Sequence, residues 1–320
     1  MIPISTYSQH QWLLGDVRNN QSLLAGLSRQ VTSGKRSVDV SAYRTQTARL
    51  LSARDMVARH ESFIGAINLT EPRAKVYDVA LTALQRVAAS VSAYVSGANS
   101  SAQATDINLD QKMATAMNEV RFYLNQTYGN RHIFSGARYG TEPVADITAL
   151  AAPAAAPPPA QIVNPALTGY DTQAPANDAN AWAKESFTAD DGLIISYGIN
   201  SQDPAFQDLV MAMRYAKAAA NDPANYDTYI NGARQLIETA RSGLQALSAD
   251  TASNLADMKR ARDHHNTVIS ALLQEQDKVE NIDLADVSTR LAAAQTQLEA
   301  TFAVTARLTQ TSLVNFLGPA

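Results

Sequence analysis

Few side chains in this sequence have the type and spacing that chemistry requires, and the adjacent pair His264 and His265 is the first candidate, for a metal site. A zinc site takes about three or four protein ligands, which on a helix must recur every three or four residues. Arg262 and Asp263, which precede the pair, do not supply such a set. His265 also falls on the apolar stripe of a predicted helix. We therefore expect a packed or surface pair, with no bound metal and no cofactor.

Other candidate sites are weaker still. The Ser-Gly-Lys segment 33–35 matches the end of a phosphate-binding loop, but the upstream Gly of that loop is absent and no strand precedes it. Asp190 and Asp191 fit a turn, and Asp283 and Asp286 fit the start of a helix, where the helix dipole favours carboxylates. No nucleophile, base and orienting group can be assembled from the sequence. We expect no catalytic residues and a protein that is not an enzyme.

Composition excludes further classes. The 320 residues contain no Cys, which excludes disulfides, thiolate catalysis and Cys-ligated metals. A net charge of −4 argues against nucleic acid or an anionic membrane as the main partner. No apolar run approaches the roughly 20 residues that cross a bilayer. The first residues lack a basic segment followed by an apolar one, so we expect no cleavable secretory signal.

The C-terminal stretch 282–317 carries an apolar stripe with coiled-coil spacing. Its members step three, four, three and four residues apart: Leu284, Val287, Leu291, Ala294 and Leu298. Such a stripe follows one side of a helix and needs a partner helix. The apolar residues that follow occupy more than one face: Phe302, Val304, Leu308, Leu313, Val314, Phe316 and Leu317. We expect a helix of this kind to be buried on several sides.

The N-terminal stretch carries a matching stripe and is the predicted partner. Its seam positions alternate steps of four and three: Leu13, Val17, Asn20, Leu24, Leu27 and Val31. Trp12, Leu14 and Leu23 widen this stripe. A single polar seam residue such as Asn20 fixes register at some cost in stability. Two ordinary amphipathic helices packed on one globular core remain the alternative.

Both seams lie at the extreme termini, where one intramolecular partner is not expected to cover a helix that is apolar on several faces. We therefore predict an assembly interface that neighbouring copies complete. We assign these residues to it: Leu13, Val17, Asn20, Leu24, Leu27, Val31, Leu284, Val287, Leu291, Leu298, Leu308, Leu313 and Phe316.

Between the termini, apolar periodicity predicts long antiparallel helices. The first helix runs from Ser5 or Thr6 to Val31 and is stopped by Ser33 and Gly34. Further stripes predict helices over residues 50–67, 80–94, 109–124, from 204 to an interruption at 221–223, and 226–279. We expect residues 68–71 to interrupt the helical pattern. Pro72 then falls in the first turn of the next helix, where proline is tolerated.

The character of the chain changes between residues 136 and 204, which are rich in Pro, Gly, Asn and Asp. The segment ALAAPAAAPPPA, residues 149–160, favours an extended conformation and is not expected to pack a core. The alternating residues Leu193, Ile195, Tyr197 and Ile199 predict a strand. We interpret this region as a small, partly β insertion.

Together these patterns predict a mainly α fold: an elongated antiparallel helical rod with paired N- and C-terminal coiled-coil helices and a small β-containing insertion domain. The predicted divisions are the terminal helices 1–36 and 281–320, the rod 37–136 and 203–280, and the Pro-rich insertion 137–202.

Several motifs carry a resemblance to a known family. They are QVTSGKR at 30–36, Leu124-Asn125 with Gly129, IFSG at 133–136, TEPV at 141–144, YGIN at 197–200, DPAF at 203–206, DLADVS at 283–288 and LVNFL at 313–317. On these residues the chain resembles the bacterial flagellin-type axial proteins, and most closely their hook-filament junction group, the third hook-associated proteins. Two segments depart from the family pattern: residues 37–44, and Pro143-Val144, where an aromatic residue after Pro is more usual.

The resemblance implies a structural subunit of the bacterial flagellum that joins hook to filament by self-assembly of its terminal helices. It implies secretion through the flagellar type III export apparatus and a place at the hook-filament junction. The implied partners are copies of the chain itself, the neighbouring axial proteins (hook-associated protein 1 and flagellin) and an export chaperone, with no nucleic acid and no membrane.

Three alternatives stay open from the sequence. The first is filament flagellin itself, which the same motifs fit. The second is a secreted adhesin or glycan-binding module, with Tyr170, Trp182 and Phe187 of the insertion as stacking surfaces. The third is a cytoplasmic signalling coiled coil, which the Pro-rich insertion disfavours.

Overall fold

A computed structural model describes residues 6–37, 39–160 and 183–316, with side chains for all of these except residues 6–10, 40 and 308–316. The chain forms two compact units, of which the first joins residues 1–59 with residues 268–320 and the second comprises residues 60–267. The boundary between them falls inside two long helices, α2 (Thr47–Gly97) and α8 (Tyr226–Glu280).

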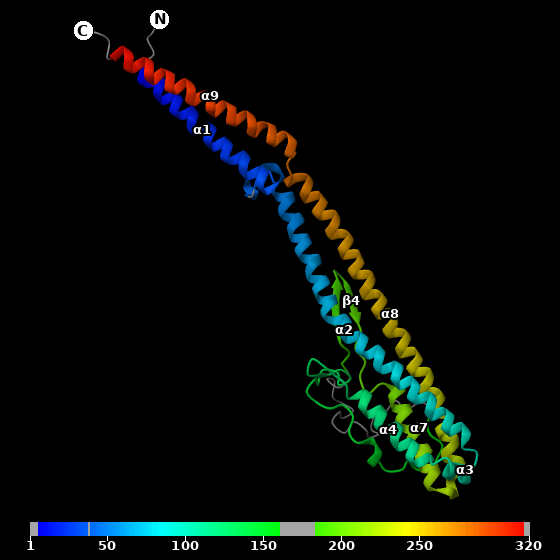
Figure 1. Ribbon diagram of the computed structural model, residues 1–320. Coiled ribbons are helices and arrows are strands. Elements are labelled where there is room, and N and C mark those ends of the chain that lie inside the picture. The colour runs from blue at the N-terminus through cyan, green and yellow to red at the C-terminus, as the bar shows by residue number, and fades with distance from the viewer. Residues whose placement is uncertain (1–5, 38, 161–182, 317–320) are drawn as a thin grey trace. The chain divides into compact units, whose positions relative to one another are not determined.

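The first unit is built on two terminal helices, α1 (Thr6–Ser33) and α9 (Leu284–Phe316), which lie side by side (Figure 1). Gly34 ends α1 with a positive φ of 70° and donates its backbone N–H to the Gln30 carbonyl oxygen at 2.8 Å. This is the glycine C-cap that the sequence predicts. Between α1 and α2 lies the short 3-10 helix η1 (Val40–Gln46), which Asp39 caps.

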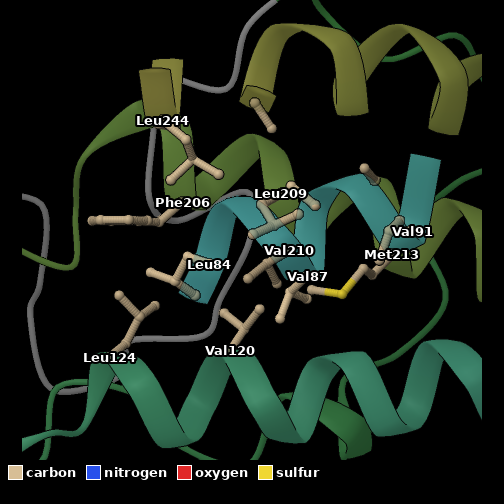
Figure 2. Packing of buried hydrophobic residues seen from close by; sticks show 14 of the residues in the cluster. Leu84, Val87, Val91, Val120, Leu124, Phe206, Leu209, Val210, Met213 and Leu244 are labelled. Carbon is tan, nitrogen blue, oxygen red and sulfur yellow. The ribbon is translucent and has the colours of Figure 1, made fainter. Parts of the chain in front are cut away.

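The second unit packs the remaining parts of α2 and α8 with the helices α3 (Ser101–Asp106), α4 (Leu109–Leu124) and α7 (Pro204–Asn221). Figure 2 shows its core, to which α2, α4, α7 and α8 all contribute. The labelled side chains are Leu84, Val87, Val91, Val120, Leu124, Phe206, Leu209, Val210, Met213 and Leu244. Asp203 caps α7 by accepting the Ala205 N–H at 3.1 Å, which places Pro204 in the first turn, where its missing N–H costs nothing.

Short strands complete the second unit. They are β1 (Thr127–Tyr128) paired with β2 (Arg131–His132), and β3 (Ser186–Asp190) paired with β4 (Leu193–Ser196), both antiparallel. Short 3-10 turns occur as η2 (Ile147–Ala149) and η3 (Pro223–Asn225). The described chain is therefore mainly α with a small β-containing insertion, as predicted. The finer division into terminal helices, rod and insertion stays a prediction.

The expected break before Pro72 is wrong, because α2 continues through it from Thr47 to Gly97. An interior proline removes one helical hydrogen bond and costs about 3 kcal/mol. Ile67, Ala74 and Tyr77, on either side of it, are at most 1% exposed. Burial of side chains of this size contributes more than the proline costs, so packing holds the helix together.

The predicted strand over residues 193–199 is also partly wrong. β4 ends at Ser196, and Leu193 is 44% exposed although Ile195 is buried. A bulge between Thr188 and Asp190 shifts the register at this end of the hairpin. A bulge re-aims the side chains beside it, so the period of two does not hold across it.

Tyr197 and Gly198 close the insertion by donating both backbone N–H groups to the Glu185 carbonyl oxygen at 3.0 Å. A methyl group at position 198 would lie 2.2 Å from the Glu185 backbone nitrogen. Only glycine allows this close approach of two backbone segments.

We expect Gly198→Ala to destabilise the second unit by about 1 to 3 kcal/mol, because the new methyl group must push the two segments apart. Thermal unfolding followed by circular dichroism would measure the loss. Gly140→Ala is the matched control, since a methyl group there meets no atom within 4 Å. Equal melting temperatures for the two variants would contradict the prediction.

Candidate assembly surface

The predicted seam lies between α1 and α9. Its covered part consists of Leu27, Val287 and Ala294, with Val31, Ile282 and Leu291 packed against them. Apart from Leu284, the remaining seam positions for which side chains are described are half-buried: Leu13, Val17, Asn20, Leu24 and Leu298. The two helices therefore pair along these positions, and the pair covers the seam only in part.

The seam of α9 differs from the prediction at both ends. Leu284 is 54% exposed and lies outside the seam. Beyond Leu298, the half-buried positions are Thr301 and Thr305, which keep the three-four spacing. Their hydroxyls donate to helix carbonyl oxygens at 2.8 and 2.7 Å, so their polar groups are satisfied within α9. Because threonine is polar, the apolar pattern of the sequence did not include Thr301 and Thr305. The side chains of the predicted residues Leu308, Leu313 and Phe316 are outside the described ones.

Large apolar side chains remain exposed on this helix pair. Trp12, on α1, is 79% exposed. The others are Leu14 and Leu23 on α1, and Leu284, Phe302 and Val304 on α9. Trp12 and Leu23, eleven residues apart, share one face of α1, and exposed apolar side chains that gather on one face are typical of a protein–protein interface. The pair presents the apolar residues that a further helix could cover.

A buried carboxylate joins the elements at the base of this helix pair. The Glu280 side chain, 4% exposed, accepts hydrogen bonds from Lys35 Nζ at 2.5 Å and from Arg54 Nη2 at 2.5 Å. The backbone pairs in the same place, because the Arg36 N–H donates to the Glu280 carbonyl oxygen at 2.8 Å and the Ile282 N–H donates to that of Gly34 at 3.1 Å. We call this group the Glu280 joint.

The electrostatics of the joint favour the charged carboxylate. Burial alone raises the pKa of Glu280, but hydrogen bonds and positive charge from Lys35 and Arg54 outweigh it and leave the pKa below its ordinary value.

A small apolar cluster of Tyr43, Leu50 and Val279 lies in the same unit. An ion pair between Arg49 and Glu275 also connects α2 to α8. The sequence did not indicate any of these charge pairs, whose members lie more than 200 residues apart.

Two histidines, His60 and His265, pack together in the second unit, whereas the side chain of His264 is 60% exposed. His265 is fully buried, its Nδ1 lies 2.8 Å from His60 Nδ1, and the Phe63 ring stacks on it at 5.3 Å. Its Nε2 lies 2.7 Å from the Ala189 carbonyl oxygen. A carbonyl only accepts, so Nε2 donates, and in the neutral ring Nδ1 accepts from His60. The pair joins α2, α8 and β3.

Among the described residues, no group of three or more His, Asp or Glu side chains is placed to hold a metal ion. Over the same part of the chain, no helix is long and apolar enough to cross a membrane. Of the insertion's aromatic residues, Phe187 is half-buried and packs edge-to-face against Tyr197 at 6.2 Å. Tyr170 and Trp182 are outside the described residues.

The motif residues between helices and insertion make specific contacts. The Asn125 side chain donates to the Val144 carbonyl oxygen at 2.8 Å and accepts the Val144 N–H at 2.9 Å. Phe134 is fully buried and packs edge-to-face against Tyr77 and Phe206. These contacts fix where the chain leaves α4 and returns to α7, so the motifs have structural roles in this fold.

The sequence matches no known protein-family description, and none of the curated proteins matches it. Solved structures do match. A protein described as a flagellar hook-associated protein, from Vibrio parahaemolyticus, is similar with a TM-score of 0.55 and 10% identity, over 75% of this chain and 100% of its own. FlgL from Bacillus cereus matches with a TM-score of 0.39 and 13% identity, over 72% of this chain and 96% of its own. Of these two, the first indicates a shared fold, which a TM-score of 0.39 does not.

We expect Glu280→Gln to loosen the joint, because the amide keeps the shape but loses two charge-assisted hydrogen bonds. The loss should be about 1 to 2 kcal/mol, at the lower end for charged bonds because Lys35 and Arg54 are partly exposed. Amide hydrogen exchange at Arg36 and Ile282 would report it, and Glu299→Gln, at an exposed position of α9, is the control.

The joint also predicts a pH dependence. A carboxyl whose pKa is lower in the folded than in the unfolded chain stabilises the fold above its unfolded pKa, near 4.3, and this stability is lost as the pH falls through the lower folded value. Protection of the Arg36 and Ile282 amides, measured relative to the intrinsic exchange rate at each pH, should therefore fall below about pH 4 in the wild type. In Glu280→Gln this acid-dependent step should be absent. An identical acid response in both chains would contradict this assignment.

Proposed function

We propose that this chain is a non-enzymatic structural subunit of the bacterial flagellum, which joins hook to filament by self-assembly of α1 and α9. The observation that carries the proposal is the α1–α9 pair, which leaves Trp12 and Phe302 exposed after its own seam has formed. The fold shared with the hook-associated protein of Vibrio parahaemolyticus supports the flagellar setting. The sequence motifs of the junction group support the place between hook and filament.

In this proposal, residues 1–36 and 281–320 form the axial core, 37–136 and 203–280 form the surrounding helical layer, and 137–202 project outward. Copies of the chain cover each other's exposed seams. The two ends of their assembly contact hook-associated protein 1 and flagellin. The chain leaves the cell through the flagellar type III apparatus, held before export by a chaperone. Its predicted interface includes Leu308, Leu313 and Phe316.

Abundance and location test the proposal against filament flagellin. Immunogold labelling of intact flagella should place the protein at a narrow band between hook and filament. Quantification of sheared flagella should find it scarce relative to the main subunit. Label along the whole filament would favour the flagellin alternative, and the absence of label from flagella would reject both.

A double substitution tests the assembly surface. We expect Trp12→Ser with Phe302→Ser to leave the melting temperature of the isolated chain nearly unchanged, because both side chains are exposed. Incorporation into flagella should fall sharply, since each aromatic contributes about 1.5 to 3 kcal/mol when buried by a neighbour. Immunoblots of sheared flagella would measure incorporation, and Val79→Ser, at an exposed position of α2, is the control. Normal incorporation of the double variant would reject the interface.

A further inference from the structure

The alanine- and proline-rich segment 149–160, which we call the strap, is held along α7 and α8. From the sequence we predicted that this segment would not pack. That prediction is wrong, because Pro158 is buried. Side chains of the two helices donate hydrogen bonds to three strap carbonyl oxygens. These are Arg214 Nη2 to Ala151 at 2.6 Å, the Tyr229 hydroxyl to Pro153 at 3.0 Å and the Tyr215 hydroxyl to Ala156 at 2.9 Å. The Thr239 hydroxyl lies 3.3 Å from the Ala160 carbonyl oxygen but 3.2 Å from the Gln235 carbonyl oxygen of its own helix.

The surface beneath the strap is shaped for proline. Tyr215 and Tyr229 pack edge-to-face with ring centroids 5.8 Å apart. Beside them, Gly232 leaves room for the Pro158 ring, because a methyl group there would lie 2.9 Å from Pro158 Cδ and 2.7 Å from Tyr215 Cδ1. Burial raises the pKa of Tyr215, which keeps its hydroxyl protonated and able to donate.

These contacts select a conformation and not a set of side chains. Every hydrogen bond goes to a main-chain carbonyl, and Pro and Ala offer no polar side chain in return. A proline segment has few amide hydrogens and a fixed φ, so its carbonyls are free to accept and little entropy is lost on binding. Aromatic grooves that donate to such carbonyls are a recurring way to bind proline-rich peptides.

We propose that the face of α7 and α8 around Tyr215, Tyr229 and Gly232 is a recognition groove for extended proline-rich peptides, with the strap as its resident ligand. Because a second copy offers the same carbonyl oxygens, the same Leu150 side chain and the same proline ring, the groove does not distinguish its own strap from that segment of another molecule. A chain whose strap is displaced therefore binds the strap of another molecule.

A peptide-binding experiment tests the groove in the full chain. The strap is replaced by a Gly/Ser sequence of equal length, and a fluorescently labelled peptide of residues 149–160 is titrated and followed by anisotropy. We expect saturable binding to the replaced chain and none to the wild type at the same concentrations, because the wild-type groove is occupied. Saturable binding to the wild type of equal strength would place the peptide elsewhere and overturn the proposal.

A glycine pair provides the matched control. In the strap-replaced chain, Gly232→Ala should weaken peptide binding by about tenfold or more, because the methyl group takes the space of the proline ring. Gly65→Ala, also inside a helix but with no atom within 4 Å of the added methyl group, should leave binding unchanged. No binding by the replaced chain, or equal binding with Gly232→Ala, would overturn the proposal.

A second variant covers the case in which strap replacement prevents folding. Tyr215→Phe with Tyr229→Phe keeps both rings and removes both hydroxyl donors. In this otherwise intact chain, exchange of the Ala156 amide, which donates to the Ala154 carbonyl oxygen at 2.8 Å, should accelerate by about tenfold, as the loss of two weak hydrogen bonds implies. Tyr128→Phe, at an exposed tyrosine, is the control. Unchanged exchange in the double variant would show that the groove does not hold the strap.

Discussion

The constraint on which the first unit depends is the burial of two heptad stripes that cover each other only in part. Long helices in water gain most of their stability from packing and little from propensity. In the described part of α1 and α9, the fully covered seam is limited to Leu27, Val287 and Ala294. Large side chains such as Trp12 and Phe302 stay in solvent. The pair therefore covers only part of its seam and leaves large apolar side chains exposed.

An apolar seam alone does not fix the register of a helix pair, because a heptad pattern tolerates a slip of seven residues. The Glu280 joint removes the ambiguity. Its two backbone hydrogen bonds and its two cation contacts are compatible with one alignment of the chain segments around Gly34 and Glu280. Burial opposes the charge of the carboxylate, and losing either cation would leave a single partner to compensate for that burial. The joint thus acts mainly on specificity, and the seam supplies the apolar burial.

Local sequence patterns predicted the features that depend on local chemistry. The Gly34 C-cap, the start of α7 at Pro204 and the pairing of α1 with α9 follow from residue types at fixed spacing. Features that depend on distant partners could not be predicted. The helix α2 continues through Pro72 because the side chains on either side of the proline are buried against other parts of the chain. The charge pairs of Glu280 join residues that are far apart in sequence. The strap was missed because its binding uses carbonyl groups, which every residue carries.

The two units bury their apolar side chains differently. Substitutions in the two units therefore have different effects on stability. The second unit has its own core, in which Phe134 packs against Tyr77 and Phe206 and the insertion is closed by tight backbone contacts at Gly198. A change there acts on the stability of the single molecule. The terminal helices have little core of their own, so a change on their exposed faces leaves the single molecule almost as stable as before. In the proposed assembly, the cost of such a change would appear where a neighbouring copy covers that face, and it would recur at every copy.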